Sequence, residues 1–281
     1  MAGIVRIHVP AHITGLFSVH PADDPLSAGS RGAGVTLANA ITVQIEPAEA
    51  TSLSINGVET SVPAVEYVIN ELGTSVRVIA NVEVPLGSGF GVSGALALGT
   101  AIGINATCET GKSENTLVGL AHAGDVRANT GLGDVVAQHR GGAPIRLEPG
   151  APGFGRLDGI PDRSHVQWLT RGELPTEDIL TGDTASIDRA GATALDRLRE
   201  RPTLDRLLAE SVRFSREAGL LTDELETIIG DVEAAGGRAA MAMLGHTVFA
   251  FDEDLTRAGY DATTHPMASG GVRIVKSDGS I

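Results

Sequence analysis

The stretch Pro85-Leu-Gly-Ser-Gly-Phe-Gly-Val-Ser-Gly-Ala-Leu-Ala-Leu-Gly99 decides the fold, because it joins two segments of different character. Before it, Val76 to Val84 alternates between apolar and polar side chains, which predicts a strand. After it, Ser93 to Asn105 is rich in Ala, Leu and Ile, which is typical of a buried helix. We therefore predict a strand, a glycine-rich loop and a helix N-terminus in succession.

The glycine-rich loop predicts a site for an anion. Gly87, Gly89, Gly91 and Gly94 have no side chains, so a ligand can touch the backbone, and they also permit positive φ. The N-terminus of the following helix adds free N–H groups and the positive end of the helix dipole. This combination favours a site that holds the phosphates of a nucleotide.

Two other phosphate-binding motifs match this region less well. The run from Gly89 to Gly94 has the spacing of the dinucleotide fingerprint, but Glu109, near the right distance for a ribose-binding acid, lies in a polar stretch. Gly111-Lys112-Ser113 looks like the end of a P-loop, but its partner glycine would fall on Ala106, and no strand precedes it. We reject the P-loop and keep a nicotinamide-binding protein as an alternative.

The composition is acidic and limits the partners of the chain. The 281 residues carry a formal net charge of −14 with no basic stripe, which argues against a nucleic-acid partner. A chain of this length can bury a good core, as one large domain or as two packed domains. The single Cys108 excludes an intramolecular disulfide framework and fits a reducing cytosol.

Nearly all the positive charge is arginine, since Lys112 and Lys276 are the only lysines. An acidic surface poor in lysine resembles the proteins of salt-accumulating archaea. In molar salt the Debye length falls to about 3 Å, so self-repulsion of the acidic surface is screened. With no N-terminal signal and no apolar run of membrane-spanning length, we expect a soluble, cytoplasmic and halophilic protein.

The run from Pro85 to Ala95 resembles the ATP-phosphate motif of the GHMP kinases, Pro-x-Gly-x-Gly-Leu-Gly-Ser-Ser-Ala. The chain departs from that pattern with Val92 in place of the first serine and with Gly94 before the alanine. The resemblance implies that ATP binds here, through these residues: Pro85, Gly87, Ser88, Gly89, Gly91, Val92, Ser93 and Gly94.

The N-terminal segment Ala11–His20 resembles the first GHMP motif, with His12 at the basic position of the family. The residues from Pro21 to Gly34 are predicted to form a turn-rich surface loop. Its run Gly-Ser-Arg-Gly-Ala-Gly is similar to that of the archaeal pantoate kinases, a branch of this family. A guanidinium can hold a carboxylate through two hydrogen bonds. The resemblance implies that His12, Ser30 and Arg31 contact the substrate.

The segment from Asn129 to Gly142 resembles the mevalonate-kinase pattern Pro-Ser-Gly-x-Asp followed by Gly-Gly. Asp134 falls on the aspartate that faces the accepting hydroxyl as catalytic base. Asp125 lies near the Mg²⁺-binding glutamate of the family, although the spacing is shorter by about two residues. The resemblance therefore implies that Asp134 is the base and that Ser93 and Asp125 bind Mg²⁺.

The run from Pro149 to Gly155 predicts a domain boundary, because it is dense in proline and glycine. Beyond it, residues 176–236 are predicted to be almost wholly helical. The resemblance implies an α+β fold with an N-terminal ribosomal-protein-S5-like α/β domain over residues 1–150. A C-terminal ferredoxin-like domain would cover residues 151–281, with the site in the cleft between the domains.

The resemblance implies ATP-dependent phosphorylation of pantoate to 4-phosphopantoate, a step of archaeal coenzyme A biosynthesis, by a small-molecule kinase that needs Mg²⁺. The third family motif is usually rich in glycine, but here only Gly245 matches it clearly, which resembles the glycine-poor motif of the pantoate kinase branch. Another acceptor, such as shikimate, homoserine or mevalonate, remains open, as does a nucleotide-binding sensor without catalysis. Retention of Asp134 argues against the sensor, and a homodimer is the default oligomeric state.

Overall fold

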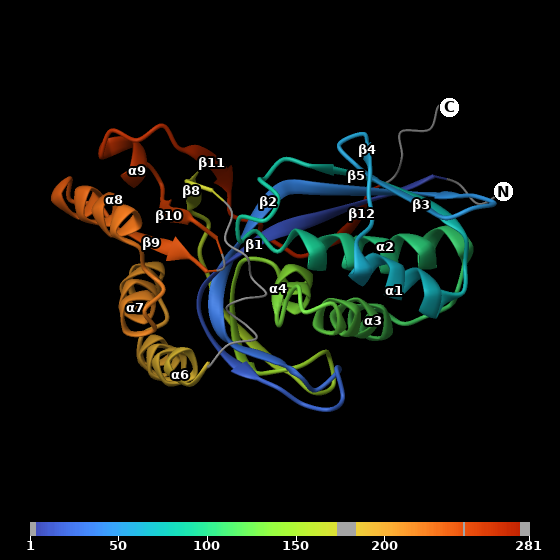
Figure 1. The fold of residues 1–281 in the computed structure, drawn as a ribbon, viewed down its shortest axis with the longest axis horizontal. Coiled ribbons are helices and arrows are strands. Elements are labelled where there is room, and N and C mark those ends of the chain that lie inside the picture. Colours follow the sequence, from blue (N-terminus) through green and yellow to red (C-terminus); the bar gives the residue numbers. More distant parts are fainter. Residues whose placement is uncertain (1–3, 173–183, 244, 276–281) are drawn as a thin grey trace.

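The computed structural model describes residues 4–172, 184–243 and 245–275. Within them, the chain forms one large sheet, one smaller sheet and the helices that cover them (Figure 1). Part of the predicted helical stretch, residues 176–183, lies outside the described residues. None of the described helices is long and apolar enough to cross a membrane.

The larger sheet has two long antiparallel strands at its centre, β1 (Val5–His20) and β2 (Gly29–Pro47). Strands follow in the order β12-β1-β2-β5-β3-β4, and β6 pairs with both β2 and β7. The remaining strands of this sheet are β3 (Ser52–Ile55), β4 (Val58–Glu59), β5 (Val76–Val82), β6 (Ala143–Glu148), β7 (Arg156–Ile160) and β12 (Arg273–Val275).

The predicted surface loop is wrong from Gly29 onward, because these residues begin β2. Residues 29–34 pair with β1, and Gly32 and Ala33 also pair with β6. The glycines that suggested a loop allow close packing of strands instead: a Cβ on Gly34 would lie 2.1 Å from the carbonyl oxygen of Ile13. Residues 29–34 are buried apart from Arg31, which is half-buried, so this end of β2 is covered rather than a surface loop.

The predicted strand, glycine-rich loop and helix are confirmed as β5, the connecting residues 83–91 and α2 (Val92–Cys108). Four helices lie on one side of the larger sheet (Figure 1): α1 (Pro63–Leu72), α2, α3 (Glu114–Arg127) and α4 (Asp134–Arg140). Helix α2 packs closely on β2, since a Cβ on Gly103 would lie 2.3 Å from Ile45 Cγ1. This burial explains why α2 is apolar all round.

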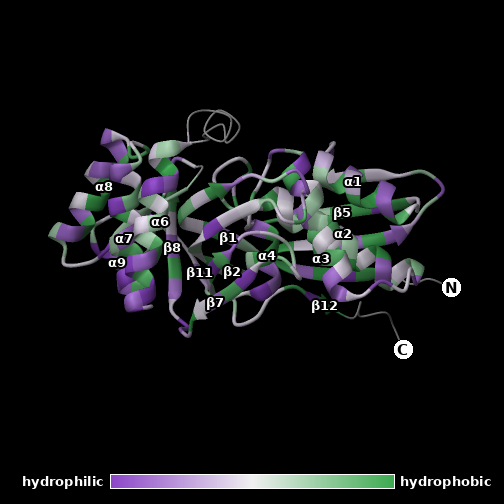
Figure 2. Cartoon of the chain, turned by 90° about the horizontal axis from the view of Figure 1, so that it is seen from below, coloured by the Kyte–Doolittle hydropathy of each residue, from purple (hydrophilic) through white to green (hydrophobic). Residues whose placement is uncertain are grey.

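The smaller sheet has the strand order β11-β8-β10-β9 and is antiparallel throughout. Its strands are β8 (His165–Thr170), β9 (Ala239–Ala242), β10 (Thr247–Phe251) and β11 (Thr263–Pro266). The helices beside it are α6 (Ala185–Glu200), α7 (Leu204–Glu217), α8 (Asp223–Ala234) and α9 (Asp254–Arg257). Figure 2 shows hydrophilic and hydrophobic residues mixed along these helices, as expected for helices with one exposed face.

The chain crosses between its two halves more than once. After the smaller sheet is complete, β12 returns to pair with β1 of the larger sheet, and β7 pairs with β6. The main connection runs from β7 into β8. The division into residues 1–150 and 151–281 stays a prediction.

Candidate active site

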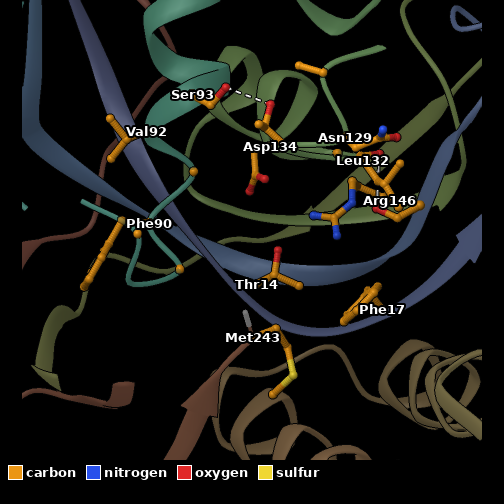
Figure 3. A pocket seen from close by; sticks show the side chains of 17 residues that line it. Thr14, Phe17, Phe90, Val92, Ser93, Asn129, Leu132, Asp134, Arg146 and Met243 are labelled. Atoms are coloured by element: carbon orange, nitrogen blue, oxygen red, sulfur yellow. Dashed lines mark hydrogen bonds between the residues drawn. The ribbon is translucent and has the colours of Figure 1, made fainter. Parts of the chain in front are cut away.

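A cavity of about 400 Å³ opens beside the glycine-rich loop (Figure 3). Its walls come from this loop, the start of α2, the connection between α3 and α4, and side chains of β1, β2 and β6. Met243, which follows β9, also lines it, and its N–H group donates to the carbonyl oxygen of Thr14 at 2.8 Å. The cavity therefore lies where the larger sheet meets the smaller one.

The glycine-rich loop is held from outside through its carbonyl groups. Three of them accept hydrogen bonds from elsewhere in the chain: Ser88 from Thr247 Oγ1 at 3.0 Å, Phe90 from the His12 N–H at 3.0 Å, and Gly91 from Gln138 Nε2 at 2.7 Å. Gly87, Gly89 and Gly91 all have positive φ, between 63° and 85°. With these carbonyls engaged and the first N–H groups of α2 lacking helical acceptors, the loop is suited to bind an anion.

The structure brings most of the predicted ATP-binding residues to the cavity. Five of them line it: Gly87, Gly89, Gly91, Val92 and Ser93. Pro85, Ser88 and Gly94 belong to the same segment but do not line it. Gly94 lets α2 approach a carboxylate instead, since a Cβ there would lie 3.0 Å from Asp125 Oδ2.

Asp125 and Ser93, the two predicted metal ligands, are in direct contact. Asp125 is almost completely buried, and its Oδ1 accepts hydrogen bonds from Ser93 Oγ at 3.0 Å and Thr130 Oγ1 at 2.7 Å. Burial, together with the negative charge of Asp134, raises the pKa of Asp125 to about 7, against the effect of those two hydrogen bonds. With no cation bound, Asp125 is therefore partly protonated near pH 7, and an approaching cation would favour loss of its proton.

The described residues contain no group of three or more His, Cys, Asp or Glu side chains that could hold a metal ion by itself. The donors near the loop, a serine hydroxyl and the carboxylates of Asp125 and Asp134, are hard oxygen ligands. Mg²⁺ in kinases is typically bound by one or two carboxylates together with the phosphates of the substrate. The residues present therefore fit Mg²⁺ that arrives with a nucleotide.

Asp134 is the first residue of α4 and forms a short hydrogen bond with His12 of β1. The distance from His12 Nδ1 to Asp134 Oδ1 is 2.6 Å, and the imidazole is fully buried. Burial lowers the pKa of His12, although Asp134 acts to raise it, so the imidazole is neutral at pH 7. The Nδ1–H group therefore donates to the carboxylate.

Asp134 itself remains ionised. Burial acts to raise its pKa, but the hydrogen bond from His12 and the positive charge of Arg146 outweigh burial and lower the pKa below its ordinary value. Its side chain is 20% exposed and faces the cavity, and among the described residues no group donates a hydrogen bond to its second oxygen, Oδ2. A carboxylate with one oxygen fixed and one oxygen free can act as a base.

Arg146 of β6 is a charged residue of the site that the sequence did not identify. It is only 2% exposed and lines the cavity, and burial lowers its pKa to about 10, so the guanidinium stays charged at pH 7. Its Nε and Nη1 are buried without a hydrogen-bond partner in the part of the chain that the structure describes. Because a buried cation with unpaired donors is costly, this arrangement indicates an anionic ligand.

The remaining predicted substrate residues lie at different depths. Ser30 lines the cavity and donates to the carbonyl oxygen of Leu132 at 3.3 Å. Arg31 does not line it, and its Nε donates to the carbonyl oxygen of Leu147 at 2.9 Å. Successive strand residues point to opposite faces, so with Ser30 at the cavity Arg31 lies on the other face of β2. His12 lies behind Asp134 rather than at the cavity surface.

The sequence and the fold both resemble those of known proteins. The model of the GHMP kinases N-terminal domain matches residues 59–142. The chain is 32% identical over 273 residues to a pantoate kinase of Thermococcus kodakarensis, covering 91% of this chain and 90% of that protein. It is 31% identical over 254 residues to a pantoate kinase of Methanocaldococcus jannaschii, covering 88% of this chain and 92% of that protein.

Solved structures agree with this relationship. A protein described as a phosphotransferase related to the CoA biosynthesis pathway superimposes with a TM-score of 0.87 at 28% identity, over 99% of this chain and 100% of that one. A homoserine kinase of Cytophaga hutchinsonii gives a TM-score of 0.68 at 15% identity, over 98% of each chain, and shows the shared fold alone. The predicted α+β fold is confirmed.

Proposed function

The chain belongs to the GHMP kinase family, and we propose that it uses ATP and Mg²⁺ to phosphorylate pantoate to 4-phosphopantoate in coenzyme A biosynthesis. Two relatives named pantoate kinases, each aligned over most of both chains, support the choice of acceptor. The observation that carries the proposal is the presence of two opposite charges, not joined in an ion pair among the described residues, at one cavity. Asp134, with its Oδ2 free, and Arg146, whose Nε and Nη1 have no partner in the described part of the chain, both line the space beside the glycine-rich loop.

Pantoate has the complementary chemistry, with a carboxylate at one end and a primary hydroxyl at the other. Arg146 would receive the carboxylate through Nε and Nη1, the two donors that lack partners. This assignment replaces Arg31, whose Nε is engaged with a backbone carbonyl away from the cavity. Ser30, at the cavity wall, already donates to the Leu132 carbonyl and would accept a further hydrogen bond.

Asp134 would orient the primary hydroxyl and take its proton through Oδ2. The new bond forms between the hydroxyl oxygen and the γ-phosphorus of ATP while the bond from that phosphorus to the β–γ bridging oxygen breaks, which releases ADP. His12 holds Oδ1 with its Nδ1–H and so keeps the second oxygen free for the substrate. Arg146 helps to keep the carboxylate ionised and ready to accept the proton.

The N–H groups of the glycine-rich loop and of the α2 N-terminus would hold the β- and γ-phosphates. Ser93 and Asp125 would hold Mg²⁺, which neutralises charge on the phosphates when it is bound. Asp125 would give up its proton on meeting the cation, because its pKa of about 7 lies close to physiological pH. The chain's own contribution is thus to place donors and charges, as phosphoryl transfer requires.

An acceptor panel tests the proposal. ADP release would be measured with Mg-ATP in potassium chloride against pantoate, mevalonate, shikimate and homoserine in parallel. We expect turnover with pantoate and none with the other three. Turnover with a different acid alone would overturn the acceptor, and ATP binding without any turnover would favour a non-catalytic sensor.

We also propose that the protein acts in the cytoplasm as a homodimer and does not bind nucleic acid. The net charge of −14 supports the last point, because a nucleic acid would be repelled by such a surface. Light scattering of the purified protein would give the mass, with about twice 28.9 kDa expected. A monomeric mass would contradict the dimer.

A further inference from the structure

The glycine-rich loop directs one large side chain, Phe90, toward the smaller sheet, and this residue borders the cavity while being only 1% exposed. It meets Trp168 of β8 edge to face, with ring centroids 4.9 Å apart and an interplanar angle of 67°. Trp168 in turn stacks on His265 of β11, at 6.3 Å and 19°. Both of these side chains are less than a tenth exposed. The loop is thus anchored to the smaller sheet by a buried row of three rings.

A second contact fixes the loop two residues earlier. Thr247 of β10 is fully buried and donates its hydroxyl to the carbonyl oxygen of Ser88 at 3.0 Å. Gly245 allows this approach, since a Cβ there would lie 2.1 Å from the same oxygen. Two strands of the smaller sheet, β8 and β10, therefore contact a loop that follows β5 of the larger one, and His265 of β11 packs against Trp168.

Such support matters because the loop is rich in glycine. Gly89 and Gly91, on the two sides of Phe90, both have positive φ and would visit many other conformations in a free chain. A cradle of N–H groups binds an anion well only when those groups already have their bound orientation, because ordering them on binding costs affinity. Holding the Phe90 ring fixes the peptide groups on either side of it.

We propose that Trp168 is a positioning residue for the nucleotide: through Phe90 it holds the glycine-rich loop in its anion-binding conformation, although it does not line the cavity. His265 stacks on the indole ring, and Thr247 holds the loop separately through the Ser88 carbonyl. The inference rests on the proposed function only for the identity of the ligand, ATP. It assigns to the smaller sheet a part in nucleotide affinity that is separate from acceptor binding.

The test compares Phe90→Ala and Trp168→Ala with Phe251→Ala as the matched control. Phe251 lies on β10 and its ring contacts Phe249, at 6.2 Å, rather than the loop. We expect each of the first two changes to raise the KM for ATP about 5- to 10-fold, the cost of ordering a loop on binding. The KM for pantoate should change less than about twofold, and Phe251→Ala should leave both values near those of the wild type.

A double variant shows whether Trp168 acts through Phe90. If it does, Phe90→Ala combined with Trp168→Ala weakens ATP binding no more than either change alone. The conservative variants Phe90→Leu and Trp168→Phe keep an apolar anchor and should recover most of the affinity. Where Trp168→Ala fails to fold, Trp168→Leu takes its place, alone and combined with Phe90→Ala, and the same criterion applies.

Calorimetry with a non-hydrolysable ATP analogue measures the affinity without an acceptor, at a temperature where every variant is folded. A wild type that binds the analogue but does not phosphorylate pantoate would overturn the proposed function and leave this inference standing. Equal rises in the KM for ATP and for pantoate, additive losses in the double variant, or an effect of Phe251→Ala as large as that of Trp168→Ala would overturn the inference.

Discussion

At the scale of single residues, the site keeps two opposite charges near each other without joining them. Asp134 and Arg146 influence each other's pKa, yet no ion pair between them is formed in the described chain. A buried charge without a partner costs several kcal/mol. Asp134 is partly exposed and hydrogen-bonded to His12, whereas Nε and Nη1 of Arg146 have no partner in the described chain. In the reaction proposed above, the acceptor would supply a hydroxyl to Asp134 and a carboxylate to Arg146.

Replacing Arg146 separates its role from that of Arg31. We expect Arg146→Met to raise the KM for pantoate about 30-fold or more, because a substrate carboxylate would lose its buried partner. Arg31→Met is the matched control and should change this KM less than about threefold, since Arg31 Nε binds the Leu147 carbonyl. Steady-state kinetics in both substrates provide the measurement, and the reverse order of effects would restore Arg31 as the carboxylate-binding residue.

Asp125 predicts a dependence of stability on pH when Mg²⁺ is absent. Its pKa in the folded chain, about 7, lies above that of an unfolded aspartate, about 3.9. The stability that its protonated form contributes is therefore complete below about pH 4 and is lost as the pH rises to about 7. The Asp125→Asn side chain does not titrate, so its stability lacks this pH dependence. The Tm of the variant minus that of the wild type should therefore grow from pH 5 to pH 8 in EDTA. Parallel curves for the two proteins would contradict the raised pKa.

At the scale of elements, glycines set how closely the helices approach the strands. In α6, a Cβ on Gly191 would lie 1.8 Å from the carbonyl oxygen of Phe17, a residue that lines the cavity. In α8, a Cβ on Gly230 would meet nothing within 4 Å. The two positions thus differ in packing although both lie inside helices.

This contrast makes Gly191→Ala and Gly230→Ala a matched pair. Alanine favours a helix over glycine, so Gly230→Ala should raise the free energy of unfolding by up to about 1 kcal/mol. Gly191→Ala should lower it by about 1–3 kcal/mol, because α6 must move away from β1. Urea unfolding followed by circular dichroism measures both, and stabilisation by both changes would show that α6 does not pack as described.

The elements that could be predicted are those whose signal is local. The strand before the glycine-rich loop and the helix after it have their own periodicity and composition, and the structure confirms them. The start of β2 could not be predicted, because Gly29 to Gly34 becomes a strand only through pairing with β1 and β6. Arg146 was missed for a related reason. A single arginine in a short strand carries no sequence pattern that indicates function. Arg146 is recognised only because the fold brings β6 and α4 to the same cavity.

At the scale of the whole molecule, the cavity lies between the two sheets: the loop that lines it contacts Trp168 of β8 and Thr247 of β10, and Met243, which follows β9, also lines the cavity. The acidic surface is the second global feature, with a net charge of −14. Self-repulsion of this charge should destabilise the folded state at low ionic strength and should be screened at high ionic strength.

The halophilic character stays a prediction, and a salt series tests it. We expect both Tm and turnover to rise when potassium chloride increases from about 0.1 M to about 2 M, where the Debye length falls below about 3 Å. Sodium chloride at the same ionic strength is the control for a specific effect of potassium. A Tm that is flat or falls with salt would contradict the prediction.

The most direct test of the central claim is the position of phosphate on the product. Pantoate would be incubated with Mg-ATP and the purified protein, and phosphorus–carbon coupling would be followed by NMR, with Asp134→Asn as the control. We expect phosphate on the oxygen of C4, and a kcat for the Asn variant that is lower by about 10²- to 10⁴-fold while ATP binding is kept. Phosphate on the C2 hydroxyl, or an Asn variant that works within tenfold of the wild type, would contradict it.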